Sequence, residues 1–225
     1  MIVADGIYYA LGLTAGGLLL SHLTNPWVGL PLYILAAFCL YFFRDPERAI
    51  PAGPVVVSPA DGKVVAVKRE SATQTRISIF LSIFDVHVNR APIGGTIAEV
   101  RYSQGSFHAA NQEKCSAENE QNVVTVRGEG TCVVFKQIAG LIARRIVFHK
   151  KPGDLVTKGE RVGLIKFGSR VDVLLGPEWE IAVETGARVL AGSSVIARRG
   201  DVPDVSLSSA RKLMVETPEL VHAKA

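Results

Sequence analysis

Residues 164–175, LIKFGSRVDVLL, read as two apolar strand segments with Gly168 and Ser169 between them. A glycine inside a strand weakens it and usually marks a bulge or the close approach of another backbone. Two interpretations follow for this pair. Either the serine lies on an ordinary bulge and faces solvent, or Ser169 has a chemical role. The rest of the chain must decide between them.

The same strand pattern continues on both sides of that stretch. Short segments rich in β-branched residues, separated by turn signals, follow one another from residue 63 to residue 197, and no long amphipathic helix interrupts them. The pattern predicts a mainly β domain, either a barrel or a sandwich. The predicted strands are KVVAVK, TRISIFLSI, GTIAEVRY, NVVTVR, TCVVFKQI, RRIVFH, RVGLIKF, RVDVLL and SSVIA.

A weak internal repeat refines this prediction. Residues 156–165 (VTKGERVGLI) resemble residues 183–192 (VETGARVLAG), and SPADGKVVAV has a similar turn followed by a strand. Repeated units of this kind resemble those of the barrel-sandwich hybrid in lipoyl and biotinyl carrier domains. We therefore expect a barrel-sandwich-hybrid-like β domain.

The N-terminal region is apolar and nearly uncharged. Two stretches, residues 7–24 and 27–43, are separated by the turn-forming pair Asn25 and Pro26. As helices they are each about 25 Å long, at the short limit for a hydrocarbon core of about 30 Å. We expect a hydrophobic helical hairpin over residues 1–43 that spans or inserts into a membrane. A hairpin buried in a soluble fold is the alternative, which the lack of a polar face disfavours.

The distribution of charged residues predicts that the rest of the chain lies at a membrane surface. The chain has 25 basic and 21 acidic residues, and Asp5 is the only charged residue before Arg44. The remaining domain is therefore mildly basic, which suits an anionic membrane. Arg44 and Arg48 follow the hairpin directly, so the positive-inside rule predicts the large domain on the cytoplasmic face of the cell membrane. Nucleic acid is not an expected partner, because the basic residues are dispersed and no RNA-binding motif occurs.

Other motifs are few. The cysteines at 39, 115 and 132 fit neither a disulfide framework nor a zinc site, and they suit a reducing cytosol. No metal-binding or nucleotide-binding motif occurs, so neither kind of site is expected. The predicted organisation is a hairpin over residues 1–43, a β domain over residues 44–200 and a C-terminal tail over residues 201–225.

Two polar residues stand out beside predicted strands. His87 follows an apolar strand in SIFDVHVNRAP, and Asp61 lies in the turn SPADGK. Their ordinary roles are those of a core histidine and of a turn aspartate bonded to its own backbone. The polar stretch 103–122 is long for a connection, so it is either functional or a flexible surface loop. Its candidate side chains are Phe107, His108 and Asn119.

Three motifs together resemble one protein family. SPADGKV, FLSIFDVHVNRAP and GLIKFGSRVDV, in this order behind an apolar N-terminus, closely resemble the short, membrane-associated phosphatidylserine decarboxylases. The resemblance covers residues 40–200, and YFFRDPER and QIAGLIARRI add to it. In that family the proenzyme cuts itself at a Gly-Ser bond, and the serine becomes a pyruvoyl group. The resemblance implies cleavage between Gly168 and Ser169, which leaves a heterodimer of β and α chains able to form a homo-oligomer.

The resemblance also implies the reaction. The pyruvoyl group from Ser169 would be the covalent cofactor, forming a Schiff base with the headgroup amine of phosphatidylserine before carbon dioxide leaves. Phosphatidylethanolamine is the expected product. His87, oriented by Asp61, would be the base for self-cleavage and the acid that reprotonates the substrate. The expected substrate-binding residues are Arg90, Phe107, His108 and Asn119.

Two features leave choices open. A second Gly-Ser pair, Gly192 and Ser193, lies in the repeat, where only a turn is expected, so it is the less favoured cleavage site. Long bacterial members carry a second histidine three residues after the position of His87, and that histidine is tied to self-cleavage. Arg90 stands at that position here, so the base is left open, and His87 is the candidate for both steps.

Two alternatives to this function remain. One is a membrane-anchored barrel-sandwich adaptor or carrier domain without catalysis, supported by the repeat, the hairpin and Lys63 in a turn. The surrounding ADGKV matches a carrier lysine poorly. The other is a decarboxylase that acts on the serine headgroup of a lipid with a different backbone, such as an ether lipid.

Overall fold

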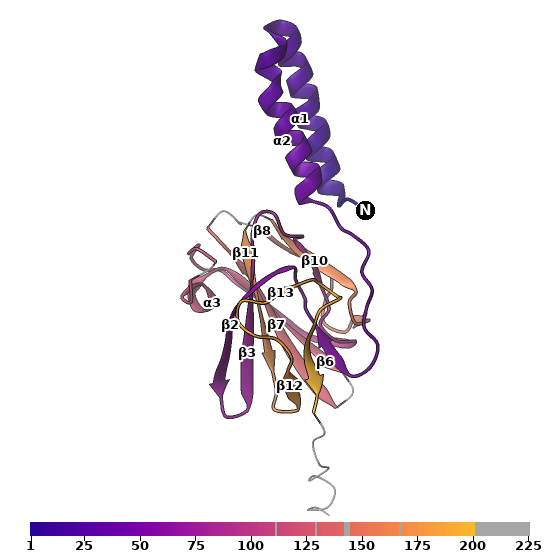
Figure 1. Ribbon diagram of the computed structural model, residues 1–225, viewed down its shortest axis with the longest axis vertical. Helices are drawn as coiled ribbons and strands as arrows, with labels where there is room; N and C mark the ends of the chain where they lie inside the picture. The colour runs from indigo at the N-terminus through magenta and orange to yellow at the C-terminus, as the bar shows by residue number, and fades with distance from the viewer. Residues whose placement is uncertain (111, 129, 142–144, 167, 201–225) are drawn as a thin grey trace, which may run out of the picture.

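A pair of apolar helices stands on a β domain in the computed structural model of the chain (Figure 1). This architecture confirms the predicted mainly β domain behind an N-terminal helical hairpin. The predicted C-terminal tail, residues 201–225, lies outside the described residues. The structure describes residues 1–110, 112–128, 130–141, 145–166 and 168–200.

The hairpin consists of α1 (Ala4–Leu23) and α2 (Pro26–Phe42). The second helix begins where it does because Asn25 caps it: its side-chain oxygen accepts a hydrogen bond from the Trp27 amide at 3.0 Å. Pro26 fits the first turn, where no amide donor is needed. With 20 residues, α1 is long and apolar enough to cross a membrane, whereas α2 has 17 residues and is shorter.

The β domain contains one eight-stranded sheet and two three-stranded sheets, all paired antiparallel. The large sheet has the order β13-β2-β3-β11-β7-β6-β5-β9, and the small sheets are β1-β14-β12 and β4-β10-β8. One short helix, α3 (Cys115–Glu118), lies in the connection between β5 and β6. The strands are β1 (Val55–Val57), β2 (Gly62–Ser71), β3 (Gln74–Leu81), β4 (Val88–Arg90), β5 (Gly95–Ser103), β6 (Gln121–Gly128), β7 (Thr131–Ala139), β8 (Arg145–Phe148), β9 (Leu155–Val156), β10 (Arg161–Lys166), β11 (Ser169–Leu175), β12 (Trp179–Ile181), β13 (Arg188–Val189) and β14 (Val195–Arg199).

All nine strands predicted from the sequence are present. The strands that the pattern did not predict are β1, β4, β9, β12 and β13, which have two or three residues each and are too short to show an alternating pattern. Both copies of the weak repeat contain a turn glycine with positive φ, Gly159 at +78° and Gly186 at +100°, just before β10 and β13. The repeat therefore corresponds to a recurring turn and strand.

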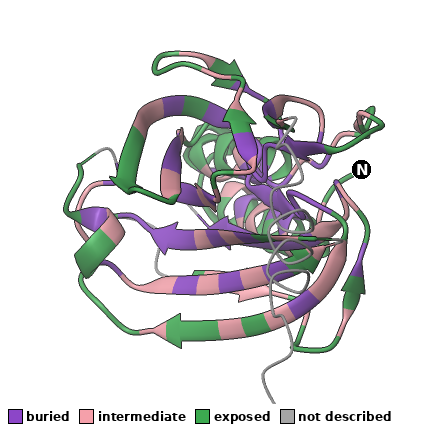
Figure 2. Cartoon of the chain, turned by 90° about the horizontal axis from the view of Figure 1, so that it is seen from below, coloured by how far each residue is buried: buried purple, intermediate pink, exposed green. Residues whose placement is uncertain are grey.

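Alternate side chains of the central strands face one hydrophobic core. Figure 2 shows the strands banded with buried and exposed residues, whereas most of the hairpin is exposed. This pattern follows from the two-residue period of a strand. Fully buried core residues from β3 and β11 are Ile77, Ile79, Leu81, Val171, Val173 and Leu175.

The base of the hairpin packs against the small sheet that contains β8 and β10. Phe42 and Phe43 are buried and form a cluster with Leu164 of β10. Lys166, the last residue of β10, forms a salt bridge of 3.1 Å with Asp5 of α1. The hairpin is therefore fixed at the end of the domain where β10 leads into β11.

Buried ion pairs hold the linker that follows the hairpin. The Asp45 carboxylate accepts a hydrogen bond from Arg90 at 3.0 Å and also contacts Arg161. Further along, Arg48 donates to both oxygens of Asp61, at 2.7 and 3.0 Å. Because these partners lie on the β domain, the linker is part of the folded unit.

Replacing Asp45 by alanine removes a carboxylate that two arginines share. The Asp45 side chain is 6% exposed, so we expect Asp45→Ala to lower the free energy of unfolding by about 3 kcal/mol. Glu47→Ala is the control, because the Glu47 side chain is 77% exposed and its loss should leave stability nearly unchanged. Chemical unfolding in detergent, followed by Trp179 fluorescence in a Trp27→Phe background, measures both. Equal effects of the two substitutions would contradict this view of the linker.

Candidate functional site

The Gly168–Ser169 peptide lies where β11 begins. Ser169 pairs with Leu81, the last residue of β3, and with Ala139, the last residue of β7. Its side chain is fully buried, and its Oγ has no hydrogen-bond partner among the described residues. A serine on a solvent-facing bulge is therefore excluded. A buried hydroxyl without a partner is costly, so it requires another explanation.

The backbone around this peptide requires two glycines. Gly168 has φ of +54°, in the left-handed region that favours glycine. Its carbonyl oxygen lies so close to Gly140 that a Cβ on that residue would be 2.2 Å away from it. The second Gly-Ser pair differs, because Ser193 is only partly buried and its amide bonds to the Leu190 carbonyl in a turn.

His87 approaches the same end of the domain from the segment between β3 and β4. Its carbonyl accepts a hydrogen bond from the amide of Ile165 in β10 at 3.3 Å, four residues before Ser169. Its Nδ1 lies 2.9 Å from the backbone carbonyl oxygen of Asp85. Because a carbonyl only accepts, Nδ1 carries the ring proton and Nε2 carries the free lone pair. Nε2 is buried and has no partner within the described part of the chain.

The surroundings of His87 keep its ring neutral. Burial lowers the pKa of His87 to about 4, an effect that the nearby Asp85 opposes and the charge of Arg44 reinforces. The ring of Phe42, the last residue of α2, stacks on the imidazole with a centroid distance of 4.2 Å and an interplanar angle of 33°. At neutral pH the His87 side chain is therefore an unprotonated, buried imidazole that Phe42, at the end of the hairpin, covers.

Asp61 does not orient His87 in this structure, which corrects that expectation. The Asp61 carboxylate accepts hydrogen bonds from Arg48 and, at 2.8 Å, from the amide of Ala191. Burial raises the pKa of Asp61. The described residues show no hydrogen bond between Asp61 and His87, and the backbone of Asp85 sets the ring orientation instead. The sequence did not predict that Asp61 would form its ion pair with Arg48.

Arg90 is also committed to the linker. Its guanidinium donates to Asp45 and to the Gly159 carbonyl, both at 3.0 Å. An arginine side chain has no lone pair with which to accept a proton. Arg90 therefore supports the fold around the site and is not itself a candidate base.

Asn119 fastens the polar connection 103–122 to the large sheet. Its amide nitrogen donates to the carbonyls of His108 and Ala139, at 2.8 and 2.7 Å, and its oxygen accepts from the His108 amide at 2.9 Å. Because Ala139 pairs with Ser169, this brace holds Phe107 and its neighbours close to the start of β11. Both amide donors of Asn119 are used within the protein, so it orders the loop.

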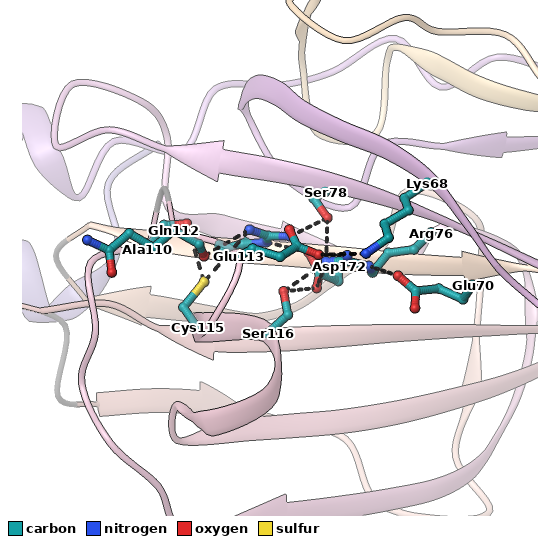
Figure 3. A network of polar contacts seen from close by, with 11 residues as sticks. Lys68, Glu70, Arg76, Ser78, Ala110, Gln112, Glu113, Cys115, Ser116 and Asp172 are labelled. Atoms are coloured by element: carbon teal, nitrogen blue, oxygen red, sulfur yellow. Dashed lines mark hydrogen bonds and ion pairs between the residues drawn. The ribbon is translucent and has the colours of Figure 1, made fainter.

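A charged network on the opposite face of β11 was missed from the sequence (Figure 3). Arg170 and Asp172 are both buried, and the Arg170 Nε donates to Asp172 at 2.7 Å. Asp172 also accepts from Ser116 at 2.6 Å and from Arg76 at 3.3 Å. Arg170 donates to Ser78 at 2.6 Å. The network satisfies charges that would be costly to bury alone.

Glu113 extends this network to the loop. It pairs with Arg76 and, at 3.4 Å, with Arg170, while Gln112 accepts from Arg170 through its carbonyl at 3.3 Å. The residues that Figure 3 draws therefore join the connection before α3 to β3 and β11. The signal in the sequence was the alternation of charged and apolar residues in RVDV, which also fits a strand with one face in water.

Comparison with known proteins agrees with these motifs. The sequence profile of one family, described as phosphatidylserine decarboxylase, matches residues 35–197. The chain belongs to the phosphatidylserine decarboxylase family. The resemblance that the motifs predicted, and with it the prediction of an enzyme of this family, is confirmed.

Individual relatives extend the match over most of the chain. It is 66% identical over 200 residues to a phosphatidylserine decarboxylase proenzyme of Solibacter usitatus, with 89% of this chain and 98% of the relative covered. Proteins of the same name from Erythrobacter litoralis and Cupriavidus pinatubonensis are 43% and 42% identical, over 217 and 200 residues. These matches cover 88% and 84% of this chain and 87% and 92% of the relatives.

The buried, neutral His87 predicts a pH-dependent stability. Between its ordinary pKa of 6.5 and the folded value of about 4, the unfolded state binds more protons than the folded state. Stability should therefore be unaffected by His87 above pH 6.5 and fall by up to about 3 kcal/mol as the pH drops from 6.5 to 4. Unfolding is measured across this range for Ser169→Ala and for Ser169→Ala with His87→Asn.

The variant that carries both substitutions is the control, because it differs from Ser169→Ala only at His87. It should lack the His87 part of the acid loss, so the two stability curves should approach one another at low pH. Parallel curves would show that His87 is not buried in its neutral form.

Proposed function

We propose that this chain cuts itself between Gly168 and Ser169 and then decarboxylates phosphatidylserine to phosphatidylethanolamine, with a pyruvoyl group made from Ser169. Two buried atoms that have no hydrogen-bond partner among the described residues carry the proposal, the Oγ of Ser169 and the Nε2 of His87. A hydroxyl and a neutral imidazole at one end of β10 and β11 fit a serine that reacts and a base that assists it. Membership of the family supports the same reading.

The backbone around Ser169 supports the proposed self-cleavage. Its Oγ attacks the carbonyl carbon of Gly168, an ester forms as the peptide C–N bond breaks, and the hydroxyl proton passes through a base to the nitrogen. Removal of the Ser169 Cα proton then expels the Gly168 carboxylate and leaves dehydroalanine. Tautomerisation and hydrolysis by water release ammonia and leave the pyruvoyl cap. The unprotonated Nε2 of His87 is the candidate base.

Decarboxylation requires a side chain that accepts and returns a proton in a site from which water is excluded. A pyruvoyl carbonyl condenses with a primary amine and draws electrons from the bond to a departing carboxylate. His87 is suited to take a proton from the headgroup ammonium, because its ring is neutral at pH 7. It can return that proton to the α-carbon after carbon dioxide leaves. Phe42 covers the ring and limits access of water.

The charged network keeps the two chains together after the cut. Arg170 and Asp172 would belong to the α chain, whereas Arg76, Glu113 and Ser116 would belong to the β chain. Strand pairing on both edges of β11 adds to this attachment. We therefore assign the mature protein as a heterodimer of its own two chains.

The hairpin is proposed to hold the protein in a membrane. Its helices expose apolar side chains around most of their surface, which is costly in water and favourable in lipid. Arg44 and Arg48 after α2 support a cytoplasmic position of the β domain, because basic residues next to a membrane segment favour that side. The most exposed apolar residues of the helices are Tyr8, Leu11, Leu18, Leu19, Leu23, Trp27 and Ile34.

Intact mass and turnover test the proposal together. The purified protein should consist of chains of 168 and 57 residues, the shorter one beginning with a pyruvoyl group in place of Ser169. Ser169→Ala should give one chain and no carbon dioxide from phosphatidylserine. His87→Ala should lower decarboxylation about 10²–10⁴-fold, the usual contribution of a positioned acid or base.

His149→Ala is the matched control, because that histidine is exposed. It should cut and turn over like the parent. An uncut parent chain that is active, a shorter chain that begins at Ser193, or a fully active His87→Ala variant would each overturn the assignment. A parent that is uncut and inactive would favour the carrier-type alternative.

A further inference from the structure

Two loop tips at the hairpin end of the β domain expose apolar side chains. Ile83 and Phe84, after β3, are 36% and 62% exposed, and Leu141, after β7, is 62% exposed. These two strands flank β11, and Ser169 lies opposite the last residue of each. The two tips therefore stand on either side of the strand that begins at the proposed cleavage site.

The first of these tips is tied to the base of the hairpin. The carbonyl of Phe84 accepts hydrogen bonds from Arg44 at 2.6 Å and from the Tyr41 hydroxyl at 3.3 Å. The Arg44 guanidinium lies 3.9 Å from the centre of the Tyr41 ring. Tyrosine and arginine at a helix end are typical of the boundary between lipid and water. Phe84 thus lies at the level where the hairpin would leave the membrane, at the end of the domain that Figure 1 shows beneath the helices.

Basic side chains lie at the same end. Lys63 is exposed and pairs with Phe80 near the end of β3. Arg188 neighbours Lys63 in the sheet, and its side chain is 69% exposed although its guanidinium pairs with Asp85 at 2.7 Å. Arg145 is exposed and pairs with Lys166, which contacts the hairpin. Such residues attract the anionic headgroups of a lipid surface.

We propose that Ile83, Phe84 and Leu141 form a rim that docks the β domain onto an anionic lipid bilayer, as a second contact besides the hairpin. The proposal rests on the proposed function only in placing the hairpin in a membrane. The structure favours a lipid bilayer as the binding partner of the rim, because the rim adjoins the end of an apolar hairpin and has basic neighbours. The docked rim brings the start of β11 to the headgroup layer, where a serine phospholipid would present its amine and carboxylate.

The experiment measures the depth of each loop tip in a bilayer. A fluorophore sensitive to polarity is attached to the full-length protein at Phe84→Cys or Leu141→Cys, in a Cys132→Ser background because the other two cysteines are buried. The protein is reconstituted into vesicles of phosphatidylcholine and phosphatidylglycerol. Lipids with a spin label near the top of the acyl chain should quench both labels, and both emission spectra should shift to the blue.

Leu155→Cys is the matched control site. Leu155 is 76% exposed. It pairs with Thr96, and Thr96 pairs with Arg127. These residues lie at the end of the large sheet opposite to Ser169. A label at this site should be neither quenched nor shifted. Equal quenching at the control and rim sites would overturn the proposal. Self-quenching between labelled copies without quenching by the lipid would also overturn it, in favour of an interface between two protein molecules.

Activity provides a second measurement. Phe84→Ser should raise the KM for phosphatidylserine in vesicles and leave kcat and self-cleavage unchanged, whereas Leu155→Ser should change none of them. A KM unchanged by Phe84→Ser would count against the rim. Lipid quenching requires no turnover, so quenching in a protein that releases no carbon dioxide would reject the proposed function alone. Turnover without quenching would reject the rim alone.

Discussion

Strand β11 is hydrogen-bonded to β3 along one edge and to β7 along the other, and this double pairing fixes the position of Ser169. Side chains alternate along a strand, so Ser169 and Val171 face the interior while Arg170 and Asp172 face the opposite side. The interior position isolates the serine hydroxyl from water. The opposite face binds the connection between β5 and β6 through an ion pair of Arg170 with Glu113 and a hydrogen bond from Ser116 to Asp172. One strand therefore positions both the candidate reactive residue, Ser169, and the charged side chains that hold the surrounding loop.

The hairpin and the candidate site form a single structural unit. Phe42 ends the second helix and stacks on His87, and the next residues of the chain form buried ion pairs with the domain. Burial under this cover accounts for the low pKa of His87. Because the same contacts seat the hairpin, we infer that detaching it from the domain would expose the imidazole to water.

The sequence predicted the larger elements because each has a period long enough to recognise. The strands of two or three residues, such as β4 and β13, form through pairing with distant segments, which a local pattern does not contain. Ser169 and His87 were predicted from their motifs. Partner choice was not predictable in the same way: Asp61 binds Arg48, and the Asp85 backbone orients His87. Several nearby cations compete for such a carboxylate, and only the folded geometry decides among them.

In the proposed self-cleavage, His87 acts as a buried base whose ring stays neutral at pH values well below 6.5. The pH dependence of self-cleavage tests it most directly, with proenzyme made by cell-free synthesis in the presence of vesicles and then shifted to a series of pH values. We expect a cleavage rate that is constant near neutrality and falls on acidification with a midpoint near 4. A midpoint at or above 6.5 would contradict it, since His87 would then titrate as an ordinary, solvated histidine.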